Sequence, residues 1–212
     1  MPYEPSKLEL PKVDSVRLRI VSEARRHFLL HGFRSVTMAD LATELGMSKK
    51  TLYTCFSSKV MLVEAVVRQK FDDIDTELEK ITAFRDVDFL NSLQQMLACV
   101  QKHTDEVQPS FVRDIQRESP ALFQLVEGRR REIIQRYFGT LFTEGQKRGM
   151  IRKDVRVDLV VAVLLAATQA IVNPATLAEF GLTPTTGFTT IIRIVLEGVL
   201  TAKGKQLPLA SE

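Results

Sequence analysis

The sequence predicts an all-α protein in which an N-terminal three-helix unit precedes a larger helical bundle. Apolar residues recur at three- and four-residue spacing in almost every segment, and no stretch alternates as a half-buried strand would. Glycine, proline and hydroxyl residues stand where helices of this spacing should begin and end. A hydrophobic content of 45% over 212 residues is enough to bury a core.

The first predicted helix follows a flexible arm, residues 1–12, which contains three prolines and no apolar period. The helix covers about 14–31 and carries one apolar stripe at i, i+4 spacing: Val16, Ile20, Ala24 and Phe28. Gly32 is placed to end it in a left-handed conformation. One face of this helix should therefore pack on the rest of the N-terminal unit.

Two short helices follow, each with a hydroxyl residue at its start. Thr37 should cap the second helix, with Asp40 three residues later as its reciprocal partner. That helix ends before Gly46, and Ser48 caps a third helix that runs to about Phe56. The spacing predicts two helices joined by a turn of three to four residues.

A long fourth helix over about 58–82 connects this unit to the rest of the chain. Helices are then expected over about 89–106, between Pro109 and Pro120, and over about 120–148. Two strongly apolar helices, about 157–172 and 186–202, close the fold. The predicted domains are 13–59 and 60–212.

Charge is distributed unevenly along the chain. Residues 1–60 hold ten Lys/Arg and six Asp/Glu, a net charge of +4, whereas the remaining residues sum to −1. A cationic end on a near-neutral body is expected where that end meets a polyanion. Chance clustering on a solvated surface would give the same asymmetry and stays open at this point.

Several classes of protein are disfavoured by composition. Cys55 and Cys99 are too few for a disulfide framework, which favours a reducing compartment. The N-terminus lacks the apolar run of a signal peptide, and the longest apolar run, 159–167, is shorter than a membrane span of about 18 residues. His27 and His31 have a zinc-binding spacing but no evident third ligand. We expect a cytoplasmic protein with no membrane partner, no cofactor and no metal.

The segment 37–56 carries the functional signal. Two short helices joined by a tight turn with Gly46 form a helix-turn-helix unit, although an ordinary helical hairpin can share that turn. Leu41 and Leu45 should pack against Leu52 and Phe56. The opposite face of the third helix then presents donors suited to phosphates and base edges: Lys49, Lys50, Thr51, Tyr53 and Thr54.

The stretch HGFRSVTMADLATELGMSKKTLYTCFSSKVML resembles the DNA-binding domain of the TetR family of regulators. The resemblance implies a homodimer that reads a palindromic operator in double-stranded DNA and a C-terminal domain that binds a small-molecule effector. It implies DNA contacts from Thr37, Ser48, Lys49, Lys50, Thr51, Tyr53, Thr54 and Lys59. The sequence departs from the family pattern at Lys50, often glycine, at Cys55, often aromatic or histidine, and at Val60-Met61, usually an acidic pair. These departures leave the operator sequence open.

The two last predicted helices are apolar nearly all round, so both sides of each must be covered. This pattern fits a four-helix interface between subunits, as in the family that the chain resembles. The predicted interface residues are Leu164, Thr168, Ile192, Val195, Leu196 and Val199. The resemblance also implies an effector pocket between the fourth and seventh helices, but the sequence identifies none of its residues.

We therefore predict a sequence-specific DNA-binding transcriptional regulator, a repressor that a small-molecule effector releases from its operator. One alternative is a helical ligand-binding or interaction protein that keeps the motif without binding DNA. A helical enzyme is the other alternative. Against it, the chain has no nucleophile motif, no glycine-rich phosphate loop and no metal-ligand cluster recognisable in the sequence.

Overall fold

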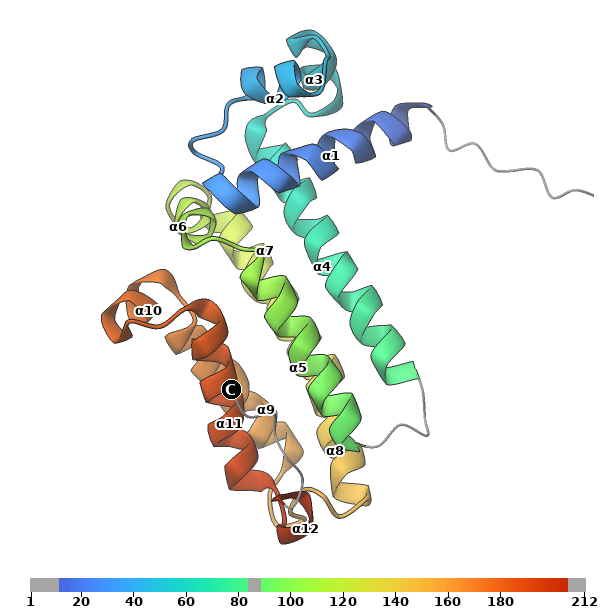
Figure 1. The fold of residues 1–212 in the computed structure, drawn as a ribbon, viewed down its shortest axis with the longest axis vertical. Helices are drawn as coiled ribbons and strands as arrows, with labels where there is room; N and C mark the ends of the chain where they lie inside the picture. Colours follow the sequence, from blue (N-terminus) through green and yellow to red (C-terminus); the bar gives the residue numbers. More distant parts are fainter. Residues whose placement is uncertain (1–11, 84–88, 206–212) are drawn as a thin grey trace, which may run out of the picture.

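A computed structural model of the chain describes residues 12–83 and 89–205, and these residues are helical almost throughout (Figure 1). The only extended pairing among them is a single antiparallel bridge between Ile151 and Leu200. The predicted all-α fold is confirmed. The helices are α1 Lys12–His31, α2 Met38–Glu44, α3 Lys49–Cys55, α4 Lys59–Ala83, α5 Phe89–Asp105, α6 Pro109–Glu118, α7 Pro120–Ile133, the π-helical turn η1 Ile134–Phe138, α8 Gly139–Lys147, α9 Val157–Ile171, α10 Pro174–Phe180, α11 Pro184–Val199 and α12 Ala202–Lys205.

The three N-terminal helices lie at one end of the molecule, and α4 runs from them along the bundle (Figure 1). The apolar stripe of α1 faces inward as predicted, because Ile20, Ala24 and Phe28 are fully buried. The predicted arm lies outside the described residues except for Lys12, which is the first residue of α1.

The C-terminal part follows the predicted order with one addition. The helix expected over 120–148 is a continuous succession of α7, η1 and α8. Between α9 and α11 lies an additional helix, α10, which was not among the predicted helices. Its start signals were present, since the Asn173 side chain accepts a hydrogen bond from Thr176 and Pro174 opens the helix. Gly181 ends it with a positive φ of 64°.

The chain buries two hydrophobic cores. The first joins α1, α2, α3 and the start of α4 to side chains from far along the chain, namely Phe111 and Ile115 of α6 and Leu122 of α7. The second joins α5, η1, α8, α9 and α11 with the remainder of α4. The N-terminal unit therefore shares its core with α6 and α7 rather than closing on residues 13–59 alone.

A polar contact reinforces the junction of α6 with the N-terminal unit. A carboxylate oxygen of Asp114 accepts a hydrogen bond from the backbone amide of Arg34, at 2.9 Å. The same oxygen lies 2.6 Å from where a Cβ on Gly32 would stand, and the φ of Gly32 is +76°. Gly32 is thus required both by the backbone turn after α1 and by the approach of α6.

Helices α9 and α11 carry apolar residues on both a buried and an exposed side. Leu164, Thr168, Ile192, Leu196 and Val199 are buried in the core of their own chain, and Val195 is half-buried. A helix that is apolar all round does not reveal which stripe faces inward, and the contact of these residues with a second subunit stays a prediction. The outward stripe carries Leu159, Val163 and Ile194, which are 61%, 51% and 66% exposed.

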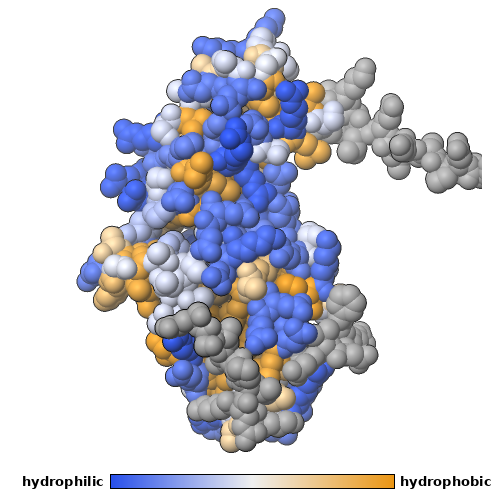
Figure 2. All heavy atoms as spheres, in the orientation of Figure 1, coloured by the Kyte–Doolittle hydropathy of each residue, from blue (hydrophilic) through white to orange (hydrophobic). Residues whose placement is uncertain are grey.

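The surface over the N-terminal helices is mostly hydrophilic in the view of Figure 2, and an apolar patch lies over α10, where Phe180 is exposed. Among the described helices, none alone combines the length and apolar composition of a membrane span. Helices α9 and α10 meet these criteria only when taken together, with a bend of 79° between them.

Candidate nucleic-acid interface

The first structural element of the site is the capped start of α2. The hydroxyl oxygen of Thr37 accepts a hydrogen bond from the Asp40 amide at 3.1 Å, and the Asp40 carboxylate accepts one from the Thr37 amide at 3.1 Å. The predicted capping box is therefore confirmed. The Thr37 hydroxyl also donates to this carboxylate, and its hydrogen bond lowers the pKa of Asp40 below the usual value.

The turn between α2 and α3 depends on Gly46. Its φ is +63°, and a Cβ there would meet no atom within 4 Å, so the requirement for glycine comes from the backbone alone. Ser48 then caps α3, because its side-chain oxygen accepts a hydrogen bond from the Thr51 amide at 3.1 Å. Together these residues fix where α3 begins.

The orientation of α3 follows from its buried side. Leu52 and Phe56 lie in the same buried core as Leu41 and Leu45, as predicted from the sequence. The opposite side of α3 is exposed and includes all five residues predicted to point outward: Lys49, Lys50, Thr51, Tyr53 and Thr54. Thr37 and Ser48 are also exposed. Two cations, several hydroxyls and a phenol therefore share one accessible face.

Two arginines of α1 hold the ends of the motif, a role that sequence reasoning missed. Arg19 donates from Nη2 to the backbone oxygen of Leu45 at 2.7 Å, and Arg17 donates from Nη1 to that of Cys55. Both acceptors stand at C-terminal ends of helices, where carbonyl groups lack intrahelical partners. The Arg17 guanidinium also lies 4.4 Å from the ring centre of Phe56. In the sequence both arginines lie off the apolar stripe of α1, as residues of a solvent-exposed face do.

Lys59 is half-buried at the start of α4. Its Nζ donates to the backbone oxygen of Arg34 at 3.3 Å and lies 5.6 Å from the ring centre of Phe33. Burial lowers the pKa of Lys59. This lysine thus joins the start of α4 to the loop before α2, and a contact with DNA phosphate stays a prediction.

Part of the N-terminal positive charge is engaged within the protein. Arg26 pairs with Glu23 and Glu44, at 2.6 and 3.1 Å. Arg25 pairs with Asp73 and with Glu106. The charge excess of the first 60 residues therefore does not act as a whole at the α3 face, where Lys49 and Lys50 are the exposed cations of the helix.

His27 lies near two carboxylates that could join it in binding a metal ion. Glu23 comes from α1 and Glu44 from α2, a proximity that the sequence did not reveal. Candidate ligand atoms of Glu23, His27 and Glu44 lie within 4.8 Å of one another. His31 lies one turn away, with its ring centre 6.3 Å from that of His27. Because Arg26 already pairs with both carboxylates, this cluster ties α1 to α2 without needing an ion.

A capped helix pair, a glycine turn and an outward cationic second helix define a helix-turn-helix DNA-binding protein. Residues 20–66 match the family model described as "Bacterial regulatory proteins, tetR family". Over 79 residues the chain is 43% identical to the HTH-type transcriptional regulator YvaF of Bacillus subtilis, a match that covers 37% of this chain and 41% of the relative. It is 25% identical over 192 residues to the HTH-type transcriptional regulator UidR of Escherichia coli, covering 88% and 93%.

The whole fold also has solved counterparts. A transcriptional regulator of Saccharomonospora viridis in complex with choline superposes with a TM-score of 0.68 at 18% identity, covering 89% of this chain and 99% of that one. An identity this low shows the shared fold alone. Residues 20–66 thus match the DNA-binding domain of tetR-family regulators, and the chain is similar over most of its length to HTH-type transcriptional regulators, which supports a DNA-binding transcriptional regulator.

Proposed function

We propose that the protein is a homodimeric repressor that grips a palindromic operator with two copies of α3 and releases it when a small-molecule effector binds. The observation that supports this most is the exposed, donor-bearing face of α3, which is held to the scaffold by Leu52 and Phe56. A rigidly mounted helix of this kind fits the major groove. Repression relieved by an effector is typical of the TetR family.

The proposed DNA contacts fall into two sets. The start of α3 would face the groove with Ser48, Lys49, Lys50 and Thr51, and Thr54 stands on the same exposed side of the helix. The DNA phosphates would be contacted by Thr37, Tyr53 and Lys59. Cations on this surface make affinity strongly dependent on salt.

We propose the outward stripe of α9 and α11 as the subunit interface. Leu159 and Val163 of α9 and Ile194 of α11 are large apolar side chains exposed on a helix pair whose other side is already buried. Arg193 and Glu197, also exposed, flank Ile194. In a two-fold interface each subunit offers the same patch, so the arginine of one copy could meet the glutamate of the other.

The proposed division of labour places DNA binding in 13–59 and effector binding and dimerisation in 60–212. The choline complex of the Saccharomonospora viridis regulator is a precedent for a small ligand in this fold. Effector binding would change the spacing of the two α3 helices by moving α4, which belongs to both cores. The proposed site of action is the cytoplasm, and no catalytic role is proposed.

The test is a selection of binding sites from a pool of random DNA duplexes with the full chain. Fluorescence anisotropy then measures the affinity of the protein for the enriched sequences. We expect an enriched palindrome and at least a tenfold loss of affinity for Lys50→Ala and Tyr53→Ala. Lys153→Ala, which removes an exposed cation in the loop before α9, is the matched control and should bind normally. Absence of any enriched sequence, or wild-type binding by both α3 variants, would favour an interaction protein that keeps the motif without using it.

A further inference from the structure

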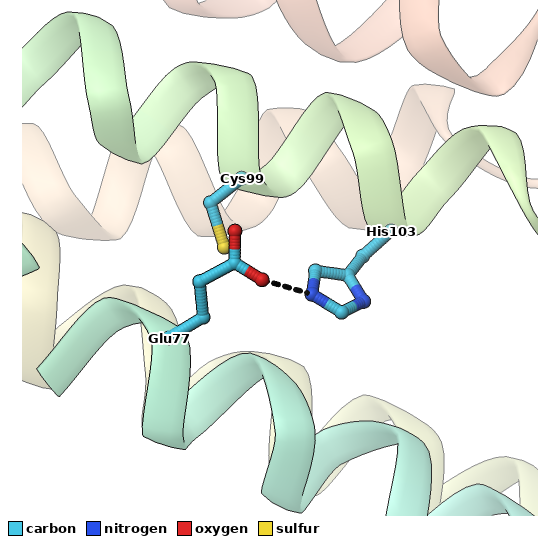
Figure 3. Close-up of side chains that lie close together, drawn as sticks. All are labelled: Glu77, Cys99 and His103. Carbon is cyan, nitrogen blue, oxygen red and sulfur yellow. Dashed lines mark hydrogen bonds and ion pairs between the residues drawn. The ribbon is translucent and has the colours of Figure 1, made fainter. Parts of the chain in front are cut away.

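Three potential metal ligands converge between α4 and α5 (Figure 3). Cys99 and His103 are four residues apart on α5, so they lie on the same side of that helix. Glu77 reaches them from α4, and its carboxylate lies 3.1 Å from Nε2 of His103. The candidate ligand atoms of all three lie within 4.8 Å of one another.

The burial of the cluster resembles that of a metal site with one open side. Cys99 and His103 are 2% and 6% exposed, while the Glu77 side chain is only partly buried. Burial raises the pKa of Cys99 to about 12, so the thiol keeps its proton when no ion is near. A divalent ion would displace that proton, as thiolate ligation requires.

Modest side-chain movement would bring the ligands to coordination distance. Thiolate, imidazole and carboxylate bind Zn²⁺ at about 2.0–2.3 Å, which places tetrahedral ligands roughly 3.5 Å apart. The separations of up to 4.8 Å therefore need to shrink by about an ångström when the ion binds. The Glu77 side chain is 35% exposed, so this side of the cluster faces solvent, and water would complete the coordination there.

The neighbouring lysines set the charge of the cluster. Nζ of Lys70 lies 3.0 Å from Nδ1 of His103, and Nζ of Lys102 lies 2.9 Å from the Glu77 carboxylate. Coordination through Nε2 leaves the ring proton on Nδ1, so Lys70 would give up this contact and keep its ion pair with Glu106. The thiolate and carboxylate supply two negative charges to the ion, and the exposed Lys102 would exchange its contact with Glu77 for water.

We propose that Glu77, Cys99 and His103 form a three-ligand site for a thiophilic divalent metal ion, with Zn²⁺ as the best match, between α4 and α5. The mixed sulfur, nitrogen and oxygen donor set favours zinc over magnesium or calcium, which take oxygen ligands. The Glu23, His27 and Glu44 cluster makes a useful contrast, because it has no thiol.

The site connects to regulation through α4. Val63 and Val66 of this helix belong to the core of the N-terminal unit, while Glu77 lies about two turns beyond Lys70 on the same helix. An ion that fastens Glu77 to α5 limits how α4 can tilt, and with it the position of α3. This consequence, unlike the site itself, depends on the proposed function.

Cobalt is the probe, because Co²⁺ bound to thiolate absorbs by charge transfer in the near ultraviolet. Titrating the full reduced chain with Co²⁺ should give this band with one ion per chain, and added Zn²⁺ should remove it. Cys99→Ser should abolish the band, and Glu77→Gln, a change at a partly exposed position, should weaken cobalt affinity at least tenfold while keeping the band. Circular dichroism checks that both variants fold.

The matched controls are Cys55→Ser, which removes the other cysteine, and His27→Ala, which breaks the second cluster. Both should retain the band and its affinity. No charge-transfer band in the wild type, or a band that Cys55→Ser abolishes, would overturn the proposed site.

A separate measurement distinguishes the site from its consequence. Operator affinity is compared with and without Zn²⁺ for the wild type and Cys99→Ser. Zinc should change affinity at least fivefold in the wild type only. A chain that binds cobalt through Cys99 but binds no DNA under any condition would refute the proposed repressor and leave the metal site standing. Operator binding that ignores zinc would refute the coupling.

Discussion

The outward stripe of α9 and α11 gives a quantitative prediction for Ile194. This side chain is 66% exposed in one chain, and full burial of an isoleucine is worth about 1.5–3 kcal/mol. Covering its exposed part in a two-fold dimer therefore contributes about 1–2 kcal/mol per copy, or about 2–4 kcal/mol per dimer. Ile194→Asp should weaken the dimer by at least about 30- to 700-fold, since 1.4 kcal/mol corresponds to a factor of ten.

The assay is sedimentation over a dilution series, which reports the dissociation constant of the dimer directly. Leu30→Asp is the matched control, because this leucine of α1 is 53% exposed and lies away from the stripe. Its variant should dimerise like the wild type. Unfolding by urea should show little change for Ile194→Asp beyond what loss of the dimer causes.

A contrasting substitution separates the two faces of α11. Ile192 is buried in the core of its own chain, so Ile192→Ala should lower the free energy of unfolding by about 2–5 kcal/mol. If Ile194→Asp left the dimer constant unchanged, the outward stripe would not be the interface, and the reasoning from exposure would be refuted.

Four further predictions concern the motif itself. Lys49→Gln should reduce the slope of log affinity against log salt by about 0.9 per lost phosphate contact, or about 1.8 per dimer, and an unchanged slope would remove Lys49 from the phosphate contacts. Gly46→Ala should cost roughly 1–2 kcal/mol in urea unfolding, because its φ is positive and no neighbouring atom would clash; a larger loss would contradict a purely backbone origin. Ser48→Ala should cost about 1 kcal/mol through loss of the α3 cap, and no loss would show that the cap is dispensable. The pKa of Asp40 is lowered in the folded chain, so its charged form stabilises the fold. This contribution to the free energy of unfolding is complete at a pH above the ordinary pKa of Asp, and it is lost as the pH falls from there through the pKa of the folded state. Asp40→Asn should therefore flatten the acid side of the stability curve, and a curve of unchanged shape would contradict this.

The sequence predicted the local features of the N-terminal unit well because each has a short-range cause. Thr37, Gly46 and Ser48 act on backbone groups within four residues, so their roles could be inferred from the chain without knowing its fold. The buried side of α3 followed from Leu52 and Phe56 in the same way. Once these are buried, geometry leaves the lysines outside.

Features that depend on distant partners could not be predicted. The arginine contacts of α1 join residues 26 and 38 positions apart, and a cation looks the same in sequence whether it is solvated or bound to a carbonyl. Which side of α9 and of α11 packs inward could not be predicted, because apolar residues surround both helices. Cys99 and His103 also acquire a shared partner only when α4 brings Glu77 to them.

The seating of α6 against the first three helices has a practical consequence for protein engineering. An excised N-terminal fragment would bare the hydrophobic surface that Phe111, Ile115 and Leu122 cover, and would lose the carboxylate that Asp114 offers to the loop after α1. Chimeras that exchange the first three helices between related regulators at the α3–α4 boundary would place them against an α6 and α7 from another protein, and the packing at this contact would be imperfect. A chimera that takes α6 from the same protein as the first three helices should avoid this defect.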